Sequence, residues 1–406
     1  MEAVLVSHPH AAAFANGVAA AFERRSKLAL YVSGVVASRA TLSGQLMNQF
    51  AAATPVVRNR IIAGVRPKRV RSLAPVELAA RLVARAFGST NRPRSLYDAM
   101  FVSHDTAVEL LEWPRRTDMV YAYEDAALRT FVRAARRGLA RVWDLPLPHY
   151  QTLEKMWIAE MARWPGAHGS DPPTPIEPDW KKRRKDAELG LATAVSVASA
   201  HTRASLEDLG VKIPVVVTPY GFPVEAFQPK TAMNDGPFTV LAVGTQDLRK
   251  GTPYLLEAWK KAGLKNAHLR LIGRLNLSSS FLDRYAGLFE HVPYEANAGL
   301  GAIYRAADLL MFPTLGDGYG LVIQEAMSCA TPVVTTPCGG GPESIRHGET
   351  GWIVPPRDID ALVEHLRFAA ANRDKIFAVG QAARARAEQW TWRQAGEALV
   401  RALSQL

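Results

Sequence analysis

Residues 308–337, DLLMFPTLGDGYGLVIQEAMSCATPVVTTP, decide the fold class of this 406-residue chain. An apolar run (308–314) is followed by a glycine-containing turn, a stretch with helical spacing that begins near Leu321, and a second apolar run (332–337). Short apolar runs that are bounded by turn residues and separated by a helix are typical of parallel strands covered on both faces. The stretch therefore predicts one βαβ unit.

The same alternation extends through both halves of the chain. In the second half, the predicted strands are 239–244, 268–273, 308–314, 332–337 and 351–356. In the first half, they are 4–8, 28–34, 119–124, 140–145, 193–199 and 215–221. We therefore predict an α/β protein with two Rossmann-like, doubly wound domains that face a cleft.

Two segments rich in proline and polar residues divide this pattern. We interpret FPVEAFQPKTAMNDGP (222–237) as a hinge between an N-terminal domain, 1–221, and a C-terminal domain, 238–385. The length of the chain also favours two domains over one hydrophobic core. The second segment, 164–180, is predicted to be a long surface loop, either a mobile lid or an insertion.

The composition, with 48% hydrophobic and 21% charged residues, is ordinary for a soluble globular protein. No run approaches the roughly 18 apolar residues of a membrane-spanning helix, and the acidic, strand-like N-terminus is unlike a signal peptide. The two cysteines, Cys329 and Cys338, form neither a disulfide framework nor a metal-ligand pattern. We therefore expect a reduced, cytoplasmic setting and no metal site.

The net charge of +11 is concentrated in the first half, where residues 1–220 hold 30 Lys and Arg against 20 Asp and Glu. The excess is densest in 58–94, at Arg58, Arg60, Arg66, Lys68, Arg69, Arg71, Arg81, Arg85, Arg92 and Arg94. This stretch is either a solvated surface or a peripheral contact with anionic lipid or a lipid-diphosphate acceptor. Nucleic acid is not expected, because aromatic residues are not interleaved with these bases.

The turn after strand 308–314 has the composition of an anion-binding helix start. Its glycines let the backbone approach a ligand, and the positive end of the helix dipole adds attraction for a diphosphate or sugar hydroxyls. The backbone N–H groups that we expect to face the ligand are those of Gly318, Tyr319, Gly320 and Leu321. Glu325, one turn into the helix, could accept hydrogen bonds from a ribose, while Asp317 precedes the turn. The alternative is an acidic residue that merely stabilises a helix N-terminus.

A second segment, VLAVGTQDLRKGTPYLLEAW (240–259), supplies a strand, a turn at Gly244, two adjacent bases and a helix. Arg249 and Lys250 would stand beside a phosphate if this turn faces the cleft. An Arg-Lys pair in a solvated turn is the alternative interpretation.

Three stretches together resemble the family-four retaining glycosyltransferases, whose GT-B fold consists of two Rossmann-like domains. Asp317 and Glu325 occupy the acidic positions of the E-x7-E motif, with Asp in place of the usual first Glu. The segment 240–259 is similar to the G-x-x-x-x-(R)KG segment, although Thr245 stands where many members have Arg. The third stretch, 335–354, resembles GG-x-x-E-x-I. The chain end resembles the family's last helix, which crosses back to the first domain, at about 386–406.

The resemblance is strong over about 215–400 and only topological before it. It implies transfer of a sugar from a nucleotide-diphosphate sugar, such as a UDP- or GDP-sugar, to a glycan or lipid-linked acceptor in envelope or exopolysaccharide synthesis. It also implies that Arg249 and Lys250 neutralise the diphosphate in place of a metal ion, and that no cofactor is needed. Glu325 would then hold the ribose, and Asp317 would orient the donor sugar.

The first half lacks the histidine that family members commonly carry after a central strand, since Pro146 stands at that place. Asp144 and His149 flank it, and we take both as candidates for the missing polar group. His149 is also interpretable as a satisfied surface histidine. Two other functions stay open for the fold: a sugar-nucleotide epimerase, and a noncatalytic partner protein docked at the inner face of the cytoplasmic membrane.

Overall fold

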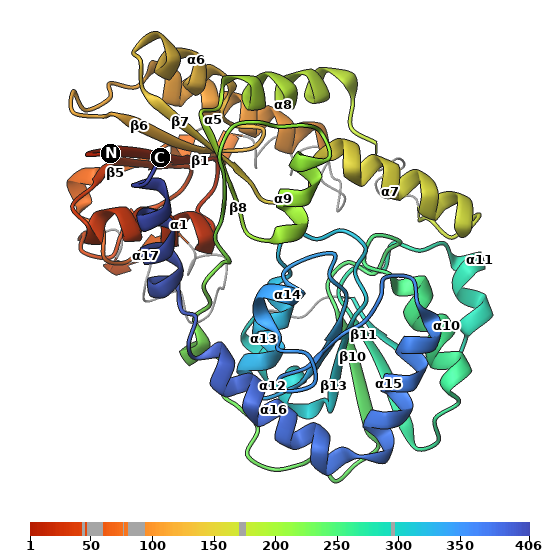
Figure 1. Ribbon diagram of the computed structural model, residues 1–406. Helices are drawn as coiled ribbons and strands as arrows, with labels where there is room; N and C mark the ends of the chain where they lie inside the picture. The colour runs from red at the N-terminus through yellow and green to blue at the C-terminus, as the bar shows by residue number, and fades with distance from the viewer. Residues whose placement is uncertain (43–44, 47–59, 76, 80–93, 170–175, 294–296) are drawn as a thin grey trace.

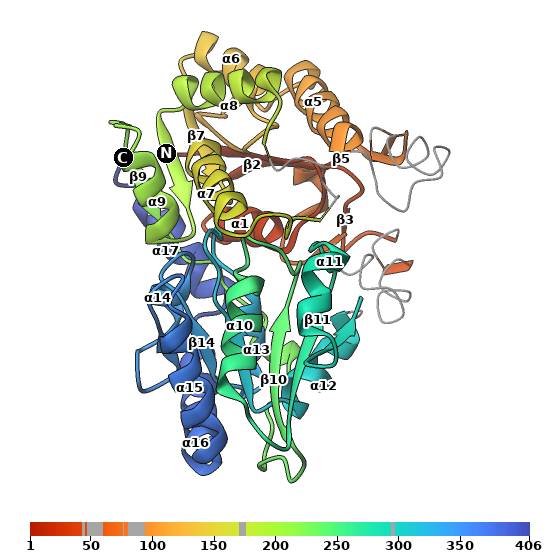
Figure 2. The same ribbon diagram turned by 90° about the vertical axis from the view of Figure 1, so that its right-hand side faces the viewer.

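The computed structural model describes residues 1–42, 45–46, 60–75, 77–79, 94–169, 176–293 and 297–406. It contains two parallel sheets, each with helices on both faces, stacked one above the other (Figures 1 and 2). The first sheet has the strand order β5-β2-β1-β6-β7-β8-β9, and the second has the order β12-β11-β10-β13-β14-β15. The predicted fold class, two doubly wound α/β domains, is confirmed.

The first sheet and its helices come mostly from the first half of the chain. Its strands are β1 (Val4–His8), β2 (Leu28–Ser33), β5 (Val70–Ser72), β6 (Met119–Tyr123), β7 (Ala140–Leu145), β8 (Ala194–Val197) and β9 (Val215–Val217). Short strands β3 (Ala37–Ser38) and β4 (Ile61–Ile62) pair with each other. The helices are α1 (Ala13–Arg24), α5 (Arg94–Leu110), α6 (Leu128–Arg136), α7 (Tyr150–Arg163), α8 (Asp179–Leu191) and α9 (Ala200–Glu207).

The second sheet follows in chain order. Its strands are β10 (Phe238–Val243), β11 (Ala267–Ile272), β12 (Glu290–Val292), β13 (Leu309–Phe312), β14 (Val333–Thr335) and β15 (Trp352–Ile353). Its larger helices are α10 (Thr252–Ala262), α12 (Asn297–Ala306), α13 (Leu321–Ser328), α15 (Ile359–Ala371) and α16 (Arg373–Ala387). The short helices α11 (Ser279–Leu282) and α14 (Gly341–Ser344) lie in connecting segments, and α17 (Trp392–Leu403) ends the fold.

Every strand predicted from the sequence is present to within a few residues. The central strands are buried along their whole length, for example β1, β6 and β13, which explains their continuous apolar runs. The edge strands β5 and β12 were not predicted. They are short, and each exposes at least one charged residue, so they have no apolar run to detect.

The strand order reverses direction once in each sheet. In the first sheet, the chain moves outward from β1 to β5 on one side and from β6 to β9 on the other. In the second sheet, the same reversal falls between β10 and β13. Ligands of open α/β sheets bind beyond the carboxyl ends of strands at such reversal points, which directs attention to the turns after β10 and β13.

Two helices pack on the domain opposite to their neighbours in sequence. The last helix, α17, lies against α1 of the first domain (Figure 1). A Cβ on Gly396 would lie 2.4 Å from that of Ala21, so glycine permits the close approach of these two helices. In the other direction, Met156 and Trp157 of α7 join the core of the second domain.

The proline-rich segment 164–180 is not a surface loop over its first part, contrary to our prediction. Ala167 is fully buried, its carbonyl accepts from Ser278 N at 2.9 Å, and Gly169 N donates to Asn276 O at 3.2 Å. Trp164 packs against aromatic rings of the second domain. The apolar anchors Trp164 and Ala167 outweigh the prolines around them. Residues 170–175 of this prediction lie outside the described part of the chain.

The segment 222–237, interpreted as the hinge, packs on the second domain. Phe222 and Val224 belong to its core, and Lys230 donates to Ala307 O at 2.6 Å. Its polar composition led to the hinge interpretation, but these anchors fix it. The chain therefore passes from the first domain to the second before Phe222. The N–H of Phe222 donates to Trp390 O at 3.3 Å, in the segment between α16 and α17 where the chain returns to the first domain.

The basic stretch 58–94 is described only in part. Three of its arginines pair with carboxylates of the same domain: Arg60 with Glu77, and Arg66 and Arg69 with Glu23. Lys68 and Arg71 are exposed. Four further bases of this stretch lie outside the described ranges: Arg58, Arg81, Arg85 and Arg92. Contact of this stretch with an anionic surface stays a prediction. Within the described ranges, no helix is both long and apolar enough to cross a bilayer.

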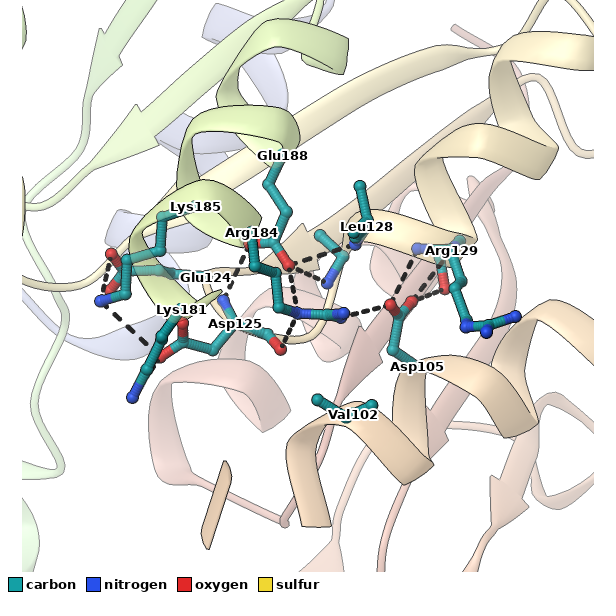
Figure 3. Close-up of polar contacts among 12 residues, drawn as sticks. Val102, Asp105, Glu124, Asp125, Leu128, Arg129, Lys181, Arg184, Lys185 and Glu188 are labelled. Atoms are coloured by element: carbon teal, nitrogen blue, oxygen red, sulfur yellow. Dashed lines mark hydrogen bonds and ion pairs between the residues drawn. The ribbon is translucent and has the colours of Figure 1, made fainter. Parts of the chain in front are cut away.

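A buried network of charges fixes α8 to the turn that follows β6 (Figure 3). Asp105 of α5 is fully buried and accepts from Arg129 N, Thr130 N and Thr130 Oγ1 at 2.7 to 2.9 Å, while Arg184 of α8 pairs with it. Glu188 of α8 accepts from the backbone N–H groups of Asp125, Ala127 and Leu128. These bonds hold the carboxyl end of β6 in place.

Candidate active site

The turns after β10 and β13 meet at the reversal point of the second sheet. Leu315 N donates to Arg249 O at 2.7 Å, which joins the two turns, and Asp317 N donates to Cys338 O at 2.9 Å. Gly251 has a φ of 71°, and a Cβ there would lie 2.0 Å from Pro313 O. Only glycine lets the β10–α10 turn close against β13 in this way.

The three predicted charged residues come together at this junction. Lys250 Nζ forms an ion pair with Asp317 Oδ2, and Arg249 Nη1 lies 3.9 Å from Asp317 Oδ1 while donating to Gly316 O at 2.8 Å. Burial alone would raise the pKa of Asp317, but Lys250, Arg249 and the Gly318 N–H outweigh it and hold that pKa below its usual value. Burial lowers the pKa of Lys250, in part against the attraction of Asp317.

The glycine loop leads directly into α13, which begins at Leu321 as the sequence predicted. Gly320, the residue before the helix, has a φ of 82° and has no side chain with which to cap the first N–H groups of the helix. Gly318 lies against the first domain: a Cβ there would be 1.6 Å from Pro146 O. Thr202 Oγ1 of α9 is 3.4 Å from Gly318 O. The loop therefore forms one of the contacts between the two domains.

Glu325 and Tyr319 have different environments. Glu325 projects from α13 toward α12, where Tyr304 Oη donates to its Oε2 at 2.7 Å, and burial raises the pKa of Glu325. Tyr319 is almost fully buried, and its hydroxyl bonds Gln324 and Ser344 on the other side of α13. Only the backbone of Tyr319 is therefore available for the predicted role in the loop.

Gly244 ends β10 with a φ of 120°, and the space beside its Cα is open. Gly273, at the end of β11, packs against the carbonyl of Gly244, since a Cβ on Gly273 would lie 2.3 Å from that oxygen. The two glycines leave room above the carboxyl ends of these neighbouring strands, as the sequence prediction for Gly244 requires.

Asp144 lies at the end of β7 in a buried cluster of hydroxyl groups. Tyr121 Oη donates to Asp144 Oδ2, and Tyr220 Oη lies 3.5 Å from Oδ1. Burial raises the pKa of Asp144 to about 7, although these hydroxyls and Ser196 counteract it. Tyr220 in turn packs edge-on against Tyr319, with ring centroids 5.7 Å apart. The ring of Tyr220 thus lies between Asp144 and Tyr319 of the glycine loop. A catalytic role for Asp144 stays a prediction.

His149 is buried at the N-terminus of α7. Its ring accepts from Gln151 N at 3.4 Å, its backbone N–H donates to Ser205 Oγ at 2.9 Å, and Asp186 lies 4.0 Å away. Burial lowers its pKa to about 4, so the imidazole is neutral near pH 7. These contacts give His149 the role of a helix cap between α7, α8 and α9. A catalytic role for it stays a prediction.

Sequence reasoning missed His201, which stands in the first turn of α9 between two contacts with the second domain. Ala200 N donates to Glu343 Oε1 at 2.6 Å, and Thr202 approaches Gly318. Burial lowers the pKa of His201, and the negative charge of Asp317 partly reverses this shift. Only its place after β8 could have marked it in the sequence, because the approach to Asp317 depends on how the domains meet.

Solved structures of similar shape place the whole chain in one fold class. Sucrose-phosphate synthase from Thermosynechococcus elongatus has a TM-score of 0.66 at 17% identity, over 100% of this chain and 99% of that one. HepE from Anabaena, solved with UDP and glucose, has a TM-score of 0.62 at 15% identity over 100% of both chains. The chain therefore has the GT-B fold.

The match to a known family lies in the second domain. Residues 237–372 match the family described as Glycosyl transferases group 1. The D-inositol 3-phosphate glycosyltransferases of Mycobacterium tuberculosis and Mycobacterium bovis are 34% identical over 113 residues, which is 27% of this chain. The matched region spans 23% of the length of these relatives. The similarity covers the segment that contains Arg249, Lys250, Asp317 and Glu325 of the candidate site.

Proposed function

We propose that the chain is a retaining glycosyltransferase that uses a nucleotide-diphosphate sugar and no metal ion. The observation that carries the proposal is the partly buried cluster of Lys250, Arg249 and Asp317 at the carboxyl ends of β10 and β13. Two bases lie there beside Asp317, where a departing diphosphate needs positive charge. HepE binds UDP and UDP-glucose, which supports a donor of this class for a chain of the same fold.

The geometry supports a division of roles. Lys250 and Arg249 stabilise the departing diphosphate, and the helix start at Gly320 and Leu321 adds N–H groups to the same region. Glu325 holds the ribose through carboxylate hydrogen bonds. Asp317 fixes the direction of Lys250 and orients the donor sugar.

The reaction that we propose proceeds on one face of the sugar. The bond between the anomeric carbon and the β-phosphate oxygen breaks while the acceptor oxygen bonds the same carbon, and the acceptor proton passes to the β-phosphate. The protein then supplies electrostatic stabilisation and no strong base. This fits a first domain whose candidate base His149 is buried in a capping contact. We further propose a glycan or lipid-linked acceptor, which the exposed Lys68 and Arg71 of the stretch 58–94 suit.

A panel of nucleotide sugars tests the proposal. The purified chain should slowly hydrolyse at least one of them, and NMR of the first-formed sugar should show the anomeric configuration of the donor. Activity should persist in EDTA, because Lys250 and Arg249 take the place of a metal ion. An inverted product would contradict retention, and loss of activity in EDTA would contradict metal independence. Absence of any turnover would favour the noncatalytic partner instead.

A further inference from the structure

A pocket of about 260 Å³ lies beside the two segments in which the chain crosses between the domains, on the side of α13 opposite to Glu325. Its walls include Tyr319 of the glycine loop, Gln324 of α13, Glu343 of α14 and Arg386 of α16. Pro219 and Trp390, from the two segments that cross between the domains, complete it. In Figure 1, α13 and α14 lie next to each other below the first domain.

The pocket is separate from the candidate donor site. Gln324 and Glu325 are neighbours on α13 and therefore project in different directions. Glu325 bonds Tyr304 of α12, whereas Gln324 Nε2 donates to Tyr319 Oη at 3.1 Å and to Ser344 Oγ at 3.0 Å. The proposed transfer reaction uses no residue whose side chain lines this pocket.

Two side-chain oxygens in the pocket wall lack partners. Gln324 is 97% buried, and in the part of the chain that the structure describes neither its Oε1 nor Glu343 Oε2 has a hydrogen-bond partner. The other oxygen of Glu343 accepts from Ala200 N at 2.6 Å, so the carboxylate is held in place. Buried acceptors without donors cost free energy, which a ligand that brings O–H groups would recover.

The remaining walls favour an uncharged ring. Trp390 donates its indole N–H to Pro219 O at 3.1 Å, so its ring adds apolar surface and no unpaired donor. The charged wall residues are one acid, Glu343, and one base, Arg386, whose charges balance. Two hydrogen-bond acceptors, a guanidinium donor and an aromatic surface together match the hydroxyl groups and the apolar face of a sugar ring.

We infer that this pocket is a second carbohydrate site, which binds one uncharged hexopyranose unit beside the domain crossings. The ligand would contact Tyr319, whose backbone belongs to the donor loop, together with Pro219 and Trp390. It would therefore link the donor loop to both crossing segments. Its occupancy should alter how the donor loop meets the first domain, and so couple glycan binding to domain closure. The inference does not depend on the proposed transfer reaction.

Saturation-transfer NMR on the full chain tests the inference, with the methyl α-pyranosides of glucose, mannose and galactose as probes. At least one should receive saturation from the wild-type protein. Glu343→Gln keeps the oxygen that bonds Ala200 and turns the free acceptor into a donor, so it should weaken binding about tenfold. Glu349→Gln, an exposed carboxylate six residues further on, is the matched control and should bind as the wild type does.

Two further variants keep the test decisive. Trp390→Leu removes the aromatic surface and should also weaken binding, which covers the case in which Glu343→Gln fails to fold in a thermal melt. Lys250→Ala disrupts the donor site and should leave the probes bound. The inference is overturned if no probe binds the wild type, if binding is unchanged in both pocket variants, or if Lys250→Ala alone abolishes it.

Discussion

One carboxylate, that of Asp317, holds the candidate site together. It pairs with Lys250, accepts from Gly318 N at 3.0 Å and lies close to Arg249, so its charge fixes both bases. Asp317→Asn should lower kcat for nucleotide-sugar turnover at least about a hundredfold, because misplaced bases no longer stabilise the leaving group. Steady-state kinetics would measure this loss. Asp283→Asn, on the surface, is the control, and equal activity of both variants would contradict the assignment.

Asp144 gives a pH-dependent prediction. Its pKa of about 7 exceeds the ordinary value because of burial, so the folded state favours the protonated carboxyl. The free energy of unfolding is therefore not lowered by ionisation of Asp144 below about pH 4. It decreases by about 1.4 kcal/mol per pH unit as the pH rises from there toward 7. Asp144→Asn should raise the melting temperature at pH 8 and leave it nearly unchanged at pH 4. Thermal melts at the two pH values would show this, and an equal shift at both would contradict it.

Residue positions were predictable where local spacing determines them. Asp317, Glu325 and the Arg249-Lys250 pair follow strands that the sequence pattern located, and parallel topology brings the ends of those strands together. The environments of Asp144 and His149 could not be predicted. Tyr220 and Ser205, which define those environments, are 76 and 56 residues away in the chain. The approach of His201 to the donor loop likewise needed the domain contact.

At the scale of elements, a buried network of charges fixes α8 within the first domain (Figure 3). Asp105→Ala would remove one of the two carboxylates that pair with Arg184 and leave three donors of Arg129 and Thr130 unsatisfied. We expect a loss of about 3 to 5 kcal/mol in the free energy of unfolding. Urea denaturation would measure it. Glu207→Ala, which breaks only the exposed pair with Arg203, should cost less than about 1 kcal/mol.

At the scale of the whole molecule, the two domains are linked by more than the chain crossings, since α7 packs on the second domain and α17 on the first (Figure 1). The sequence predicted the last helix and its crossing, whereas α7 lay inside the predicted first domain, 1–221, because its packing partners, such as Tyr254, are distant in the sequence. Glu160 of α7 is fully buried, accepts from Tyr254 Oη at 2.6 Å and pairs with Arg357 at 2.6 Å.

Removal of that carboxylate should loosen α7 from the second domain. Glu160→Ala leaves Tyr254 and Arg357 without their shared acceptor, so we expect a stability loss of about 3 kcal/mol. Cleavage between α7 and α8 should also be faster in limited proteolysis, because the segment 164–169 depends on the same contact surface. An unchanged cleavage rate would show that α7 is not a link between the domains. Lys155→Ala, which changes an exposed residue of the same helix, is a suitable control.

The central claim is that a nucleoside diphosphate binds at the ends of β10 and β13 with its ribose on Glu325. Calorimetric titration of UDP and GDP into the wild type and Glu325→Ala tests it most directly. We predict that at least one of them binds the wild type, and that Glu325→Ala weakens this binding at least about tenfold, as loss of hydrogen bonds to a carboxylate should. Absence of binding, or equal affinity in both proteins, would contradict the account.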